Sequence, residues 1–188
     1  MEQSIIDNLP DILKNFTDTL EKISCDYSKK KKQYMTNSQK IAINFDKVKV
    51  NYSTQNGINQ PKSNDALYIT KNNIHYFIEF KNGNYRNIKK FDLIVKIYDS
   101  LFILSDIKYQ NGNQYIQNIV GFSKNNINYI LVYNSSSNSK SHNYNLRYYI
   151  KGKFGLVKFE KFLLKEIYIY DENKFETKFI NGIIANES

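Results

Sequence analysis

The sequence predicts an α/β domain in which helices flank a mixed β-sheet. Two β-rich runs, residues 65–70 and 74–81, are separated by a short turn at 71–73, and this arrangement is typical of a hairpin. Apolar residues then recur with a helical period over residues 88–104. A strongly apolar run at residues 127–133 has the length and composition of a buried strand. Strands and helices that follow one another in this order indicate the α/β class.

The segment before the hairpin predicts one long helix and one strand. Apolar residues at spacings of three and four indicate a helix over residues 4–26, with Pro10 at its start or at a kink. Residues 41–50 alternate apolar and polar side chains, as a half-buried strand does. Residues 51–64 are rich in Asn, Ser and Gln and are therefore expected to form a loop.

The C-terminal segment is predicted to form short strands and a closing helix. Residues 146–150 and 166–170 have the composition of short strands, and Asp171 is placed to cap a last helix. The run from 147 to 154 mixes cations with aromatic residues, as surfaces that bind single-stranded nucleic acid do. A plain strand with its aromatic side chains in the core is the alternative interpretation of that run.

The chain is basic. Its 188 residues include 27 Lys and Arg against 18 Asp and Glu, so the formal net charge is +9 at pH 7. A basic excess of this size attracts polyanions, of which nucleic acid is the commonest. Lys, Asn, Ile and Tyr are all abundant, however, which is the mark of an AT-rich genome and raises the net charge without a functional cause. Charge therefore permits a nucleic-acid partner but does not establish one.

The inventory of cysteine and histidine excludes several kinds of site. A single cysteine, Cys25, excludes an internal disulfide and a multi-cysteine zinc site. Two histidines leave little room for a histidine-based metal site, and His75 is expected to pack or to contact solvent rather than to bind a metal. A secretory signal is not visible, and no apolar run approaches the roughly 18 residues that span a bilayer. We therefore expect a cytoplasmic location and no membrane association.

Glu79 needs an explanation because it lies in a run that is otherwise apolar or aromatic. Burying a lone carboxylate is costly, so Glu79 is expected to have a cationic partner or a metal ion. Side chains alternate along a strand, so Lys81 should point to the same face as Glu79. If residues 71–73 form a three-residue turn, Asp65 stands directly opposite Glu79, whereas a two-residue turn would break this match.

A pair of neighbouring carboxylates suits a divalent metal ion. Two such groups repel one another unless a cation lies between them. A hard ion such as Mg²⁺ takes oxygen ligands and therefore suits Asp65 and Glu79. Lys81 could stabilise developing negative charge or help to deprotonate a metal-bound water. Together these parts suit metal-dependent hydrolysis of a phosphodiester.

On these residues the chain resembles the PD-(D/E)XK nuclease superfamily, which has the restriction-endonuclease-like fold. The matching motif is Asn64-Asp65 followed by Glu79-Phe80-Lys81. The family core runs helix, three strands, helix, strand, and the predicted elements follow that order. The resemblance implies a nuclease-like α-β-β-β-α-β core over residues 1–134 and a C-terminal extension over 135–188, packed on the same domain. Asn64 departs from the proline that is common at this position in the superfamily.

The resemblance also implies roles for individual residues. Asp65 and Glu79 would bind Mg²⁺, and Lys81 would act at the attacking water, so these three are the expected catalytic residues. Family members often add an acidic metal ligand from the first helix, and Glu21 is the candidate in this chain. The implied activity is hydrolysis of DNA or RNA. Small nucleases of AT-rich bacteria and their mobile elements often serve defence, phage or toxin systems.

Basic residues around the second helix are candidates for contact with a nucleic-acid backbone. They are Arg86, Lys89, Lys90 and Lys96. An ordinary solvated helix face is at least as good an interpretation of their spacing.

The motif itself is not specific. An acidic residue with a lysine two positions later also occurs at Asp106, Glu172 and Glu176, so its place in an apolar strand selects the site. In an ordinary hairpin, Glu79 and Lys81 would instead reach solvent or pair with neighbours. The chain would then be a non-catalytic nucleic-acid-binding or protein-interaction module of the same architecture. An immunity or inhibitor protein is a third alternative.

Overall fold

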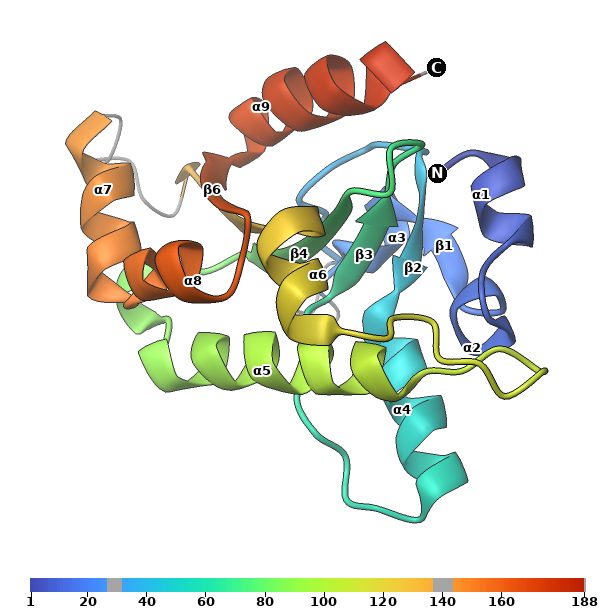
Figure 1. The fold of residues 1–188 in the computed structure, drawn as a ribbon. Coiled ribbons are helices and arrows are strands. Elements are labelled where there is room, and N and C mark those ends of the chain that lie inside the picture. Colours follow the sequence, from blue (N-terminus) through green and yellow to red (C-terminus); the bar gives the residue numbers. More distant parts are fainter. Residues whose placement is uncertain (27–31, 137–143, 188) are drawn as a thin grey trace.

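A six-stranded mixed sheet forms the centre of the computed structural model, which describes residues 1–26, 32–136 and 144–187 (Figure 1). The strands lie side by side in chain order. They are β1 (Thr17–Thr19), β2 (Ile41–Asn44), β3 (Ala66–Ile69), β4 (His75–Lys81), β5 (Ile127–Tyr133) and β6 (Glu166–Asp171). β1 to β4 pair antiparallel, whereas β4, β5 and β6 run parallel. This mixed sheet with its flanking helices confirms the predicted α/β class.

Helices connect the strands and close the chain. They are α1 (Gln3–Asp7), α2 (Asp11–Lys14), α3 (Leu20–Ile23), α4 (Phe45–Asn56), α5 (Lys90–Asp106), α6 (Ile119–Asn126), α7 (Tyr144–Lys153), α8 (Leu156–Phe162) and α9 (Glu172–Lys174). α9 continues into a π-helix, η3 (Phe175–Ile184), and single turns form at η1 (Tyr85–Asn87) and η4 (Ala185–Glu187). Among the described residues, no helix is both long and apolar enough to cross a membrane.

Different helices cover the two faces of the central strands because side chains alternate along each strand. Tyr76 and Phe80 of β4 point toward the C-terminal helix, which is formed by α9 and η3 together. Tyr76 packs against Phe179 with ring centroids 5.0 Å apart, and Phe80 packs against Phe175 at 5.5 Å. Glu79 points to the opposite face, where α5 lies. Figure 1 shows α5 and the C-terminal helix on opposite sides of the sheet.

The hairpin of β3 and β4 has the register that a three-residue turn predicts. Thr70 N–H donates to the carbonyl of Ile74 at 2.9 Å, and Asn73 adopts a left-handed φ of 58° in the turn. Ala66 pairs with Ile78, so the same register places Asp65 beside Glu79. The hairpin thus brings the two acidic residues to one end of the central strands.

The helix predicted over residues 4–26 is wrong in its extent. Three short helices, α1, α2 and α3, take its place. Pro10 is the residue before α2 and cannot continue α1, because it lacks an N–H. Thr17–Thr19 instead forms β1, where Asp18 pairs with Ala42 of β2. Pairing with the sheet therefore overrides the helical spacing of this segment.

The strand predicted over residues 41–50 ends early, at Asn44. The side chain of Asn44 accepts a hydrogen bond from Lys47 N–H at 3.1 Å and so caps the first turn of α4. α4 ends at Gly57, which has the left-handed φ of 63° that favours glycine. The loop predicted over 51–64 therefore begins only after Gly57. α4 also stands between the first two strands of the implied α-β-β-β-α-β core, so the element order is not that of the plain core.

The strand predicted at residues 146–150 is also wrong, since α7 forms there. Ile150 and Phe154 are four residues apart and both are buried. Tyr148 and Tyr149 are exposed, with 77% and 56% of their surface accessible, so these two rings do not belong to the core. The aromatic and β-branched residues Tyr148, Tyr149 and Ile150 favour a strand by composition, although their burial follows a helical period.

The strand predicted at residues 166–170 is confirmed as β6. It lies parallel to β5, with Asp171 opposite Tyr133. The side chain of Asp171 accepts a hydrogen bond from Lys174 N–H at 2.8 Å, which confirms it as the cap of the last helix.

His75 packs in the core, which is the first of the two environments that the sequence allows for it. Its Nε2 lies 2.7 Å from the Tyr115 hydroxyl, and its Nδ1 lies 3.2 Å from the carbonyl oxygen of Asn73. The ring also packs edge-on against Phe122, with centroids 5.0 Å apart. Burial of the imidazole lowers the pKa of His75 to about 4.

This burial predicts a specific dependence of stability on pH. The unfolded chain binds a proton at His75 near pH 6.5, whereas the folded chain binds it only near pH 4. The contribution of His75 is therefore present above pH 6.5 and is lost as the pH falls from 6.5 to 4, by about 3 kcal/mol in all. We expect His75→Gln to remove this part of the acid-induced loss of stability, as measured by urea unfolding across the window. Parallel pH profiles of the two proteins would contradict the assignment.

Candidate active site

Asp65, Glu79 and Lys81 come together at the carboxyl end of β4. Asp65 directly precedes β3, and Glu79 and Lys81 lie on the same face of β4. The side chain of Glu79 is fully buried, whereas Lys81 retains 28% of its exposure. Asp65 retains 17%. The site is therefore closed around Glu79 and open toward Asp65 and Lys81.

Lys96 of α5 joins these three residues and lies between the two carboxylates. Its Nζ is 2.7 Å and 2.9 Å from the two oxygens of Glu79 and 3.3 Å from Oδ1 of Asp65. The sequence places Lys96 on a helix face that contacts solvent or phosphate, and this expectation is wrong, because the side chain is only 18% exposed. The spacing of apolar residues along the helix does not predict that the Lys96 side chain points toward the sheet.

The cluster of Asp65, Glu79, Lys81 and Lys96 balances its formal charges. Lys81 Nζ lies 2.5 Å from Oε1 of Glu79, the same oxygen that Lys96 contacts. Two ammonium groups therefore neutralise two carboxylates. A buried carboxylate with this many hydrogen-bonded cations is held at a tolerable cost in desolvation.

Asp65 is held from the backbone as well. Phe80 N–H donates to Oδ2 of Asp65 at 2.6 Å, so the carboxylate is fixed to the strand that carries Glu79. Burial and the negative charge of Glu79 raise the pKa of Asp65 to about 7, although Lys96 and the Phe80 N–H act in the opposite direction. For Lys96, the two carboxylates outweigh the effect of burial, and its pKa is raised.

The hydroxyl of Tyr129, from β5, belongs to the same region. Tyr129 is 1% exposed, and within the described part of the chain its hydroxyl has no hydrogen-bond partner. Burial raises the pKa of Tyr129, and the negative charges of Glu79 and Asp65 raise it further. An unsatisfied buried hydroxyl is costly, so the Tyr129 hydroxyl needs a partner that the described residues do not supply.

A cavity of about 320 Å³ opens beside the cluster. Asp65 and Lys81 line it together with Cys25 and Asp26, which follow α3, and Asp46 of α4. The cavity thus gives access from solvent to one carboxylate and one ammonium of the cluster, those of Asp65 and Lys81.

Asp46 is an acidic residue of this region that the sequence did not single out. Its Oδ1 accepts hydrogen bonds from the Ser63 hydroxyl at 2.6 Å and from Lys49 Nζ at 2.9 Å. Its negative charge acts on Lys96 and helps to raise the pKa of that lysine. The sequence feature that could have revealed Asp46 is Asn44, two residues earlier. As a helix cap it starts α4 where a strand is predicted, and so places Asp46 in the first turn of that helix.

Glu21 does not join Asp65 and Glu79, which corrects the expectation that it is a third metal ligand. It lies on α3, and its carboxylate accepts a hydrogen bond from Gln39 Nε2 at 3.1 Å. Among residues 1–26, 32–136 and 144–187, no three His, Cys, Asp or Glu side chains form a group that could hold a metal ion. The carboxylates that converge are those of Asp65 and Glu79.

The donor atoms of this pair suit Mg²⁺, because both residues offer carboxylate oxygens and one face of Asp65 reaches the cavity. Three of the four carboxylate oxygens contact Lys96 Nζ, and the fourth, Oδ2 of Asp65, accepts a hydrogen bond from Phe80 N–H. A metal ion could therefore be held by Asp65 and Glu79 only in place of the Lys96 ammonium.

Arg86, Lys89 and Lys90 lie around the first turn of α5, and all three are exposed. Both Lys81 and Lys89 act electrostatically on Asp92, which lies in the first turn of α5. The structure therefore brings the first turn of α5 toward the site, although none of the three side chains belongs to the cluster.

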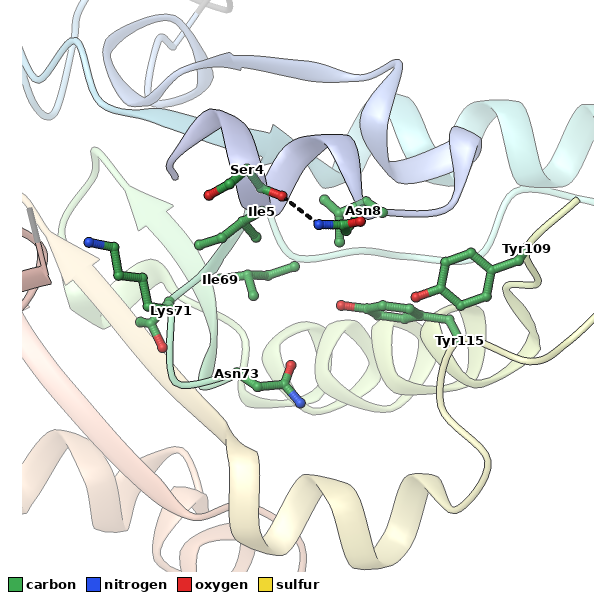
Figure 2. Close-up of a pocket in the computed structure, with 10 residues that line it drawn as sticks. Ser4, Ile5, Asn8, Ile69, Lys71, Asn73, Tyr109 and Tyr115 are labelled. Carbon is green, nitrogen blue, oxygen red and sulfur yellow. Dashed lines mark hydrogen bonds between the residues drawn. The ribbon is translucent and has the colours of Figure 1, made fainter.

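A second cavity, of about 390 Å³, lies at the other end of the hairpin (Figure 2). Ile5, Lys71, Asn73 and Tyr115 are among its lining residues, and Figure 2 shows them around the β3–β4 turn. None of the described residues that line it carries a carboxylate, and Lys71 is paired with Glu2 at 2.7 Å. Its residues therefore offer no acid–base or metal chemistry comparable to that of the cluster.

Comparison with known proteins adds no relationship, because no family model, curated protein or solved structure matches the chain. What the site can do must be derived from its own residues.

The ion pairs predict unequal losses of stability. Glu79→Ala leaves the ammonium of Lys96 buried without its main partner, and we expect a loss of about 3–5 kcal/mol. Lys81→Ala leaves Glu79 paired with Lys96 and is expected to cost about 1–2 kcal/mol. Chemical unfolding of the two variants and the wild type measures the difference. Equal losses would show that Lys96 does not hold Glu79 as described.

Proposed function

We propose that this protein is a metal-dependent nuclease of the PD-(D/E)XK type that hydrolyses phosphodiester bonds in DNA or RNA. One observation carries the proposal: Asp65 and Glu79 flank a single cation at the end of adjacent strands, with Lys81 beside them at the mouth of a cavity. These are the residues of the Asp … Glu-x-Lys motif, brought together by the register of the hairpin.

Each residue of the motif has a task that its position supports. Asp65 and Glu79 would hold Mg²⁺, which when bound would polarise the scissile phosphate as a Lewis acid. Lys81 presents a positive charge at the cavity, where it can stabilise the negative charge that builds up on the phosphate. Lys81 is also anchored to Glu79, so its ammonium is held in place before a substrate arrives.

The charges around the cavity support a polyanionic substrate. The chain has a formal net charge of +9, and Arg86, Lys89 and Lys90 are exposed around the first turn of α5. Lys81 and Lys89 both act electrostatically on Asp92, in the first turn of α5. We expect a backbone that reaches the cavity to extend toward these cations. A role in a defence, phage or toxin system belongs to the same proposal.

A second candidate is a non-catalytic nucleic-acid-binding or protein-interaction module of the same architecture. The position of Lys96 favours it, because an ammonium already fills the space where a nuclease needs its metal ion. Binding of nucleic acid without cleavage by the wild-type protein would favour this candidate.

Cleavage assays with Mg²⁺ or Mn²⁺ separate the two candidates. We expect the wild-type protein to cut single-stranded DNA, double-stranded DNA or RNA. Asp65→Asn, Glu79→Gln and Lys81→Met should each lower the rate about 100-fold or more, because each removes a charge that acts on the transition state. Gel electrophoresis of labelled oligonucleotides measures the rate.

Lys178→Met is the matched control, since Glu176-Thr177-Lys178 repeats the acidic-x-lysine spacing in the C-terminal helix. This variant should cleave as the wild type does. Activity that survives in all three variants of the motif would contradict the proposal, as would a wild-type protein that cuts none of the substrates.

The basic residues predict the salt dependence of binding. In the variant Arg86→Gln/Lys89→Gln/Lys90→Gln, we expect weaker binding to an oligonucleotide in the absence of divalent metal. If each side chain contacts one phosphate, the slope of log affinity against log salt should fall by about three. Fluorescence anisotropy at several salt concentrations measures the slope.

A control with the same change in charge is Lys108→Gln/Lys124→Gln/Lys178→Gln, because these three lysines are also exposed. Lys124 precedes β5 and so lies at the opposite end of the sheet from Lys81. Equal effects in the two triple variants would show that net charge, rather than the first turn of α5, binds the nucleic acid.

A further inference from the structure

We propose that Lys96 is a built-in counter-cation that a divalent metal ion must displace, so that the ammonium and the metal compete for one place between Asp65 and Glu79. The inference rests on the proposed function and concerns the regulation of the same site. It makes Lys96 the residue that sets the metal affinity of this protein.

The geometry supports competition rather than joint occupancy. Lys96 Nζ contacts both oxygens of Glu79 and Oδ1 of Asp65, at 2.7, 2.9 and 3.3 Å. A metal ion bound to both carboxylates needs the same oxygens and carries the same sign of charge. The two cations would therefore repel one another strongly at such short range, in a site that is largely shielded from water.

Lys81 differs from Lys96 in a way that lets it stay. Its Nζ contacts Oε1 of Glu79, and it lines the cavity rather than lying between the two carboxylates. Displacement of Lys96 would remove the cation shared by Asp65 and Glu79 without by itself moving Lys81, which can shift along the cavity if the metal ion takes Oε1. The expected active state retains the lysine of the motif and loses only the lysine of α5.

A displaced Lys96 has another acidic residue within electrostatic range. Asp46 lines the same cavity as Asp65, and its charge already acts on Lys96. Its side chain is 49% exposed, so it lies toward solvent. A flexible lysine can thus move toward Asp46 without becoming a buried, unpaired charge.

A buried hydroxyl to which the described chain offers no partner lies within electrostatic range of this site. Tyr129 is buried, and its hydroxyl has no hydrogen-bond partner among the described residues, although the charges of Asp65 and Glu79 act on it. Mg²⁺ keeps several of its waters when carboxylates bind it. The waters of a hydrated ion are therefore candidate partners for this hydroxyl.

Calorimetric titration with Mn²⁺ tests the competition. We expect Lys96→Gln to bind Mn²⁺ about tenfold or more tightly than the wild type, because removal of the ammonium leaves two carboxylates without their shared cation. Lys124→Gln, a change of the same charge at an exposed lysine that precedes β5, should bind Mn²⁺ as the wild type does. A folded Lys96→Gln variant that binds Mn²⁺ no more tightly than the wild type would overturn the inference.

A second measurement keeps the test decisive if Lys96→Gln does not fold. Reductive methylation of the wild-type protein, read by mass spectrometry, reports the accessibility of each lysine amine. The methylation of Lys96 should rise several-fold at saturating Mn²⁺, and Asp65→Asn should abolish this rise. A Lys96 that stays equally protected while Mn²⁺ is bound would overturn the inference.

Failure of the inference can be told apart from failure of the proposed function. A wild type that cleaves nucleic acid, with a metal affinity that does not depend on Lys96, overturns only the competition. Release of Lys96 by Mn²⁺ without any cleavage supports the competition and contradicts the nuclease. If neither the wild type nor Lys96→Gln binds Mn²⁺, both proposals fall.

Discussion

The buried carboxylate of Glu79 is the constraint on which the rest of the site depends. A carboxylate that is 0% exposed in the middle of a sheet must be neutralised locally, and two ammonium groups do this, at 2.5 Å and 2.7 Å. Lys81 follows from the alternation of β4, but Lys96 requires α5 to lie directly over that strand. The charge of Glu79 thus ties the helix to the hairpin at one point and at one rotation of the helix.

Such a cluster is a poor way to stabilise a fold. Well-packed apolar side chains in place of a buried ion pair are often neutral or even stabilising, by about 1–4 kcal/mol. The face of β4 that carries Glu79 also carries Phe77, which packs edge-on against Phe45 at 5.1 Å, so an apolar residue would fit the surroundings of the strand. Under the function proposed above, the charges serve the chemistry of the site rather than the stability of the fold. The cavity beside Asp65 and Lys81 is consistent with that role.

Features determined by local sequence could be predicted, whereas features determined by tertiary packing could not. The three-residue turn of the hairpin determines the register, so the meeting of Asp65 and Glu79 followed from counting residues. Lys96 was misplaced because its helix offers several polar faces, and only the packing of α5 on the sheet selects the one that turns inward. Asp46 was missed for a different reason. The alternation that indicates a strand continues past Asn44, whose capping hydrogen bond begins a helix instead.

Longer elements showed the same division. The apolar run of β5 is buried along its whole length and was predicted with its bounds correct, because no partner other than the sheet could satisfy it. The prediction of one long N-terminal helix was wrong because Thr17–Thr19 pairs with β2 instead of continuing the helix. The strand prediction at α7 was wrong because the exposed Tyr148 and Tyr149 give this helix the composition of a strand. The periodicity of apolar residues identified the buried core. It could not predict elements whose secondary structure is decided by pairing or packing with one neighbouring element.

The most direct test of the account is crystallography with Mn²⁺ and a short oligonucleotide bound to the Glu79→Gln variant and to the wild type. Anomalous scattering locates the metal without reference to activity. The account predicts, in the wild type, a peak between the carboxylates of Asp65 and Glu79, the Lys96 ammonium withdrawn from that place, and a phosphate within reach of Lys81. A metal that binds elsewhere, or a Lys96 that keeps its contacts while nucleic acid occupies another surface, would contradict it.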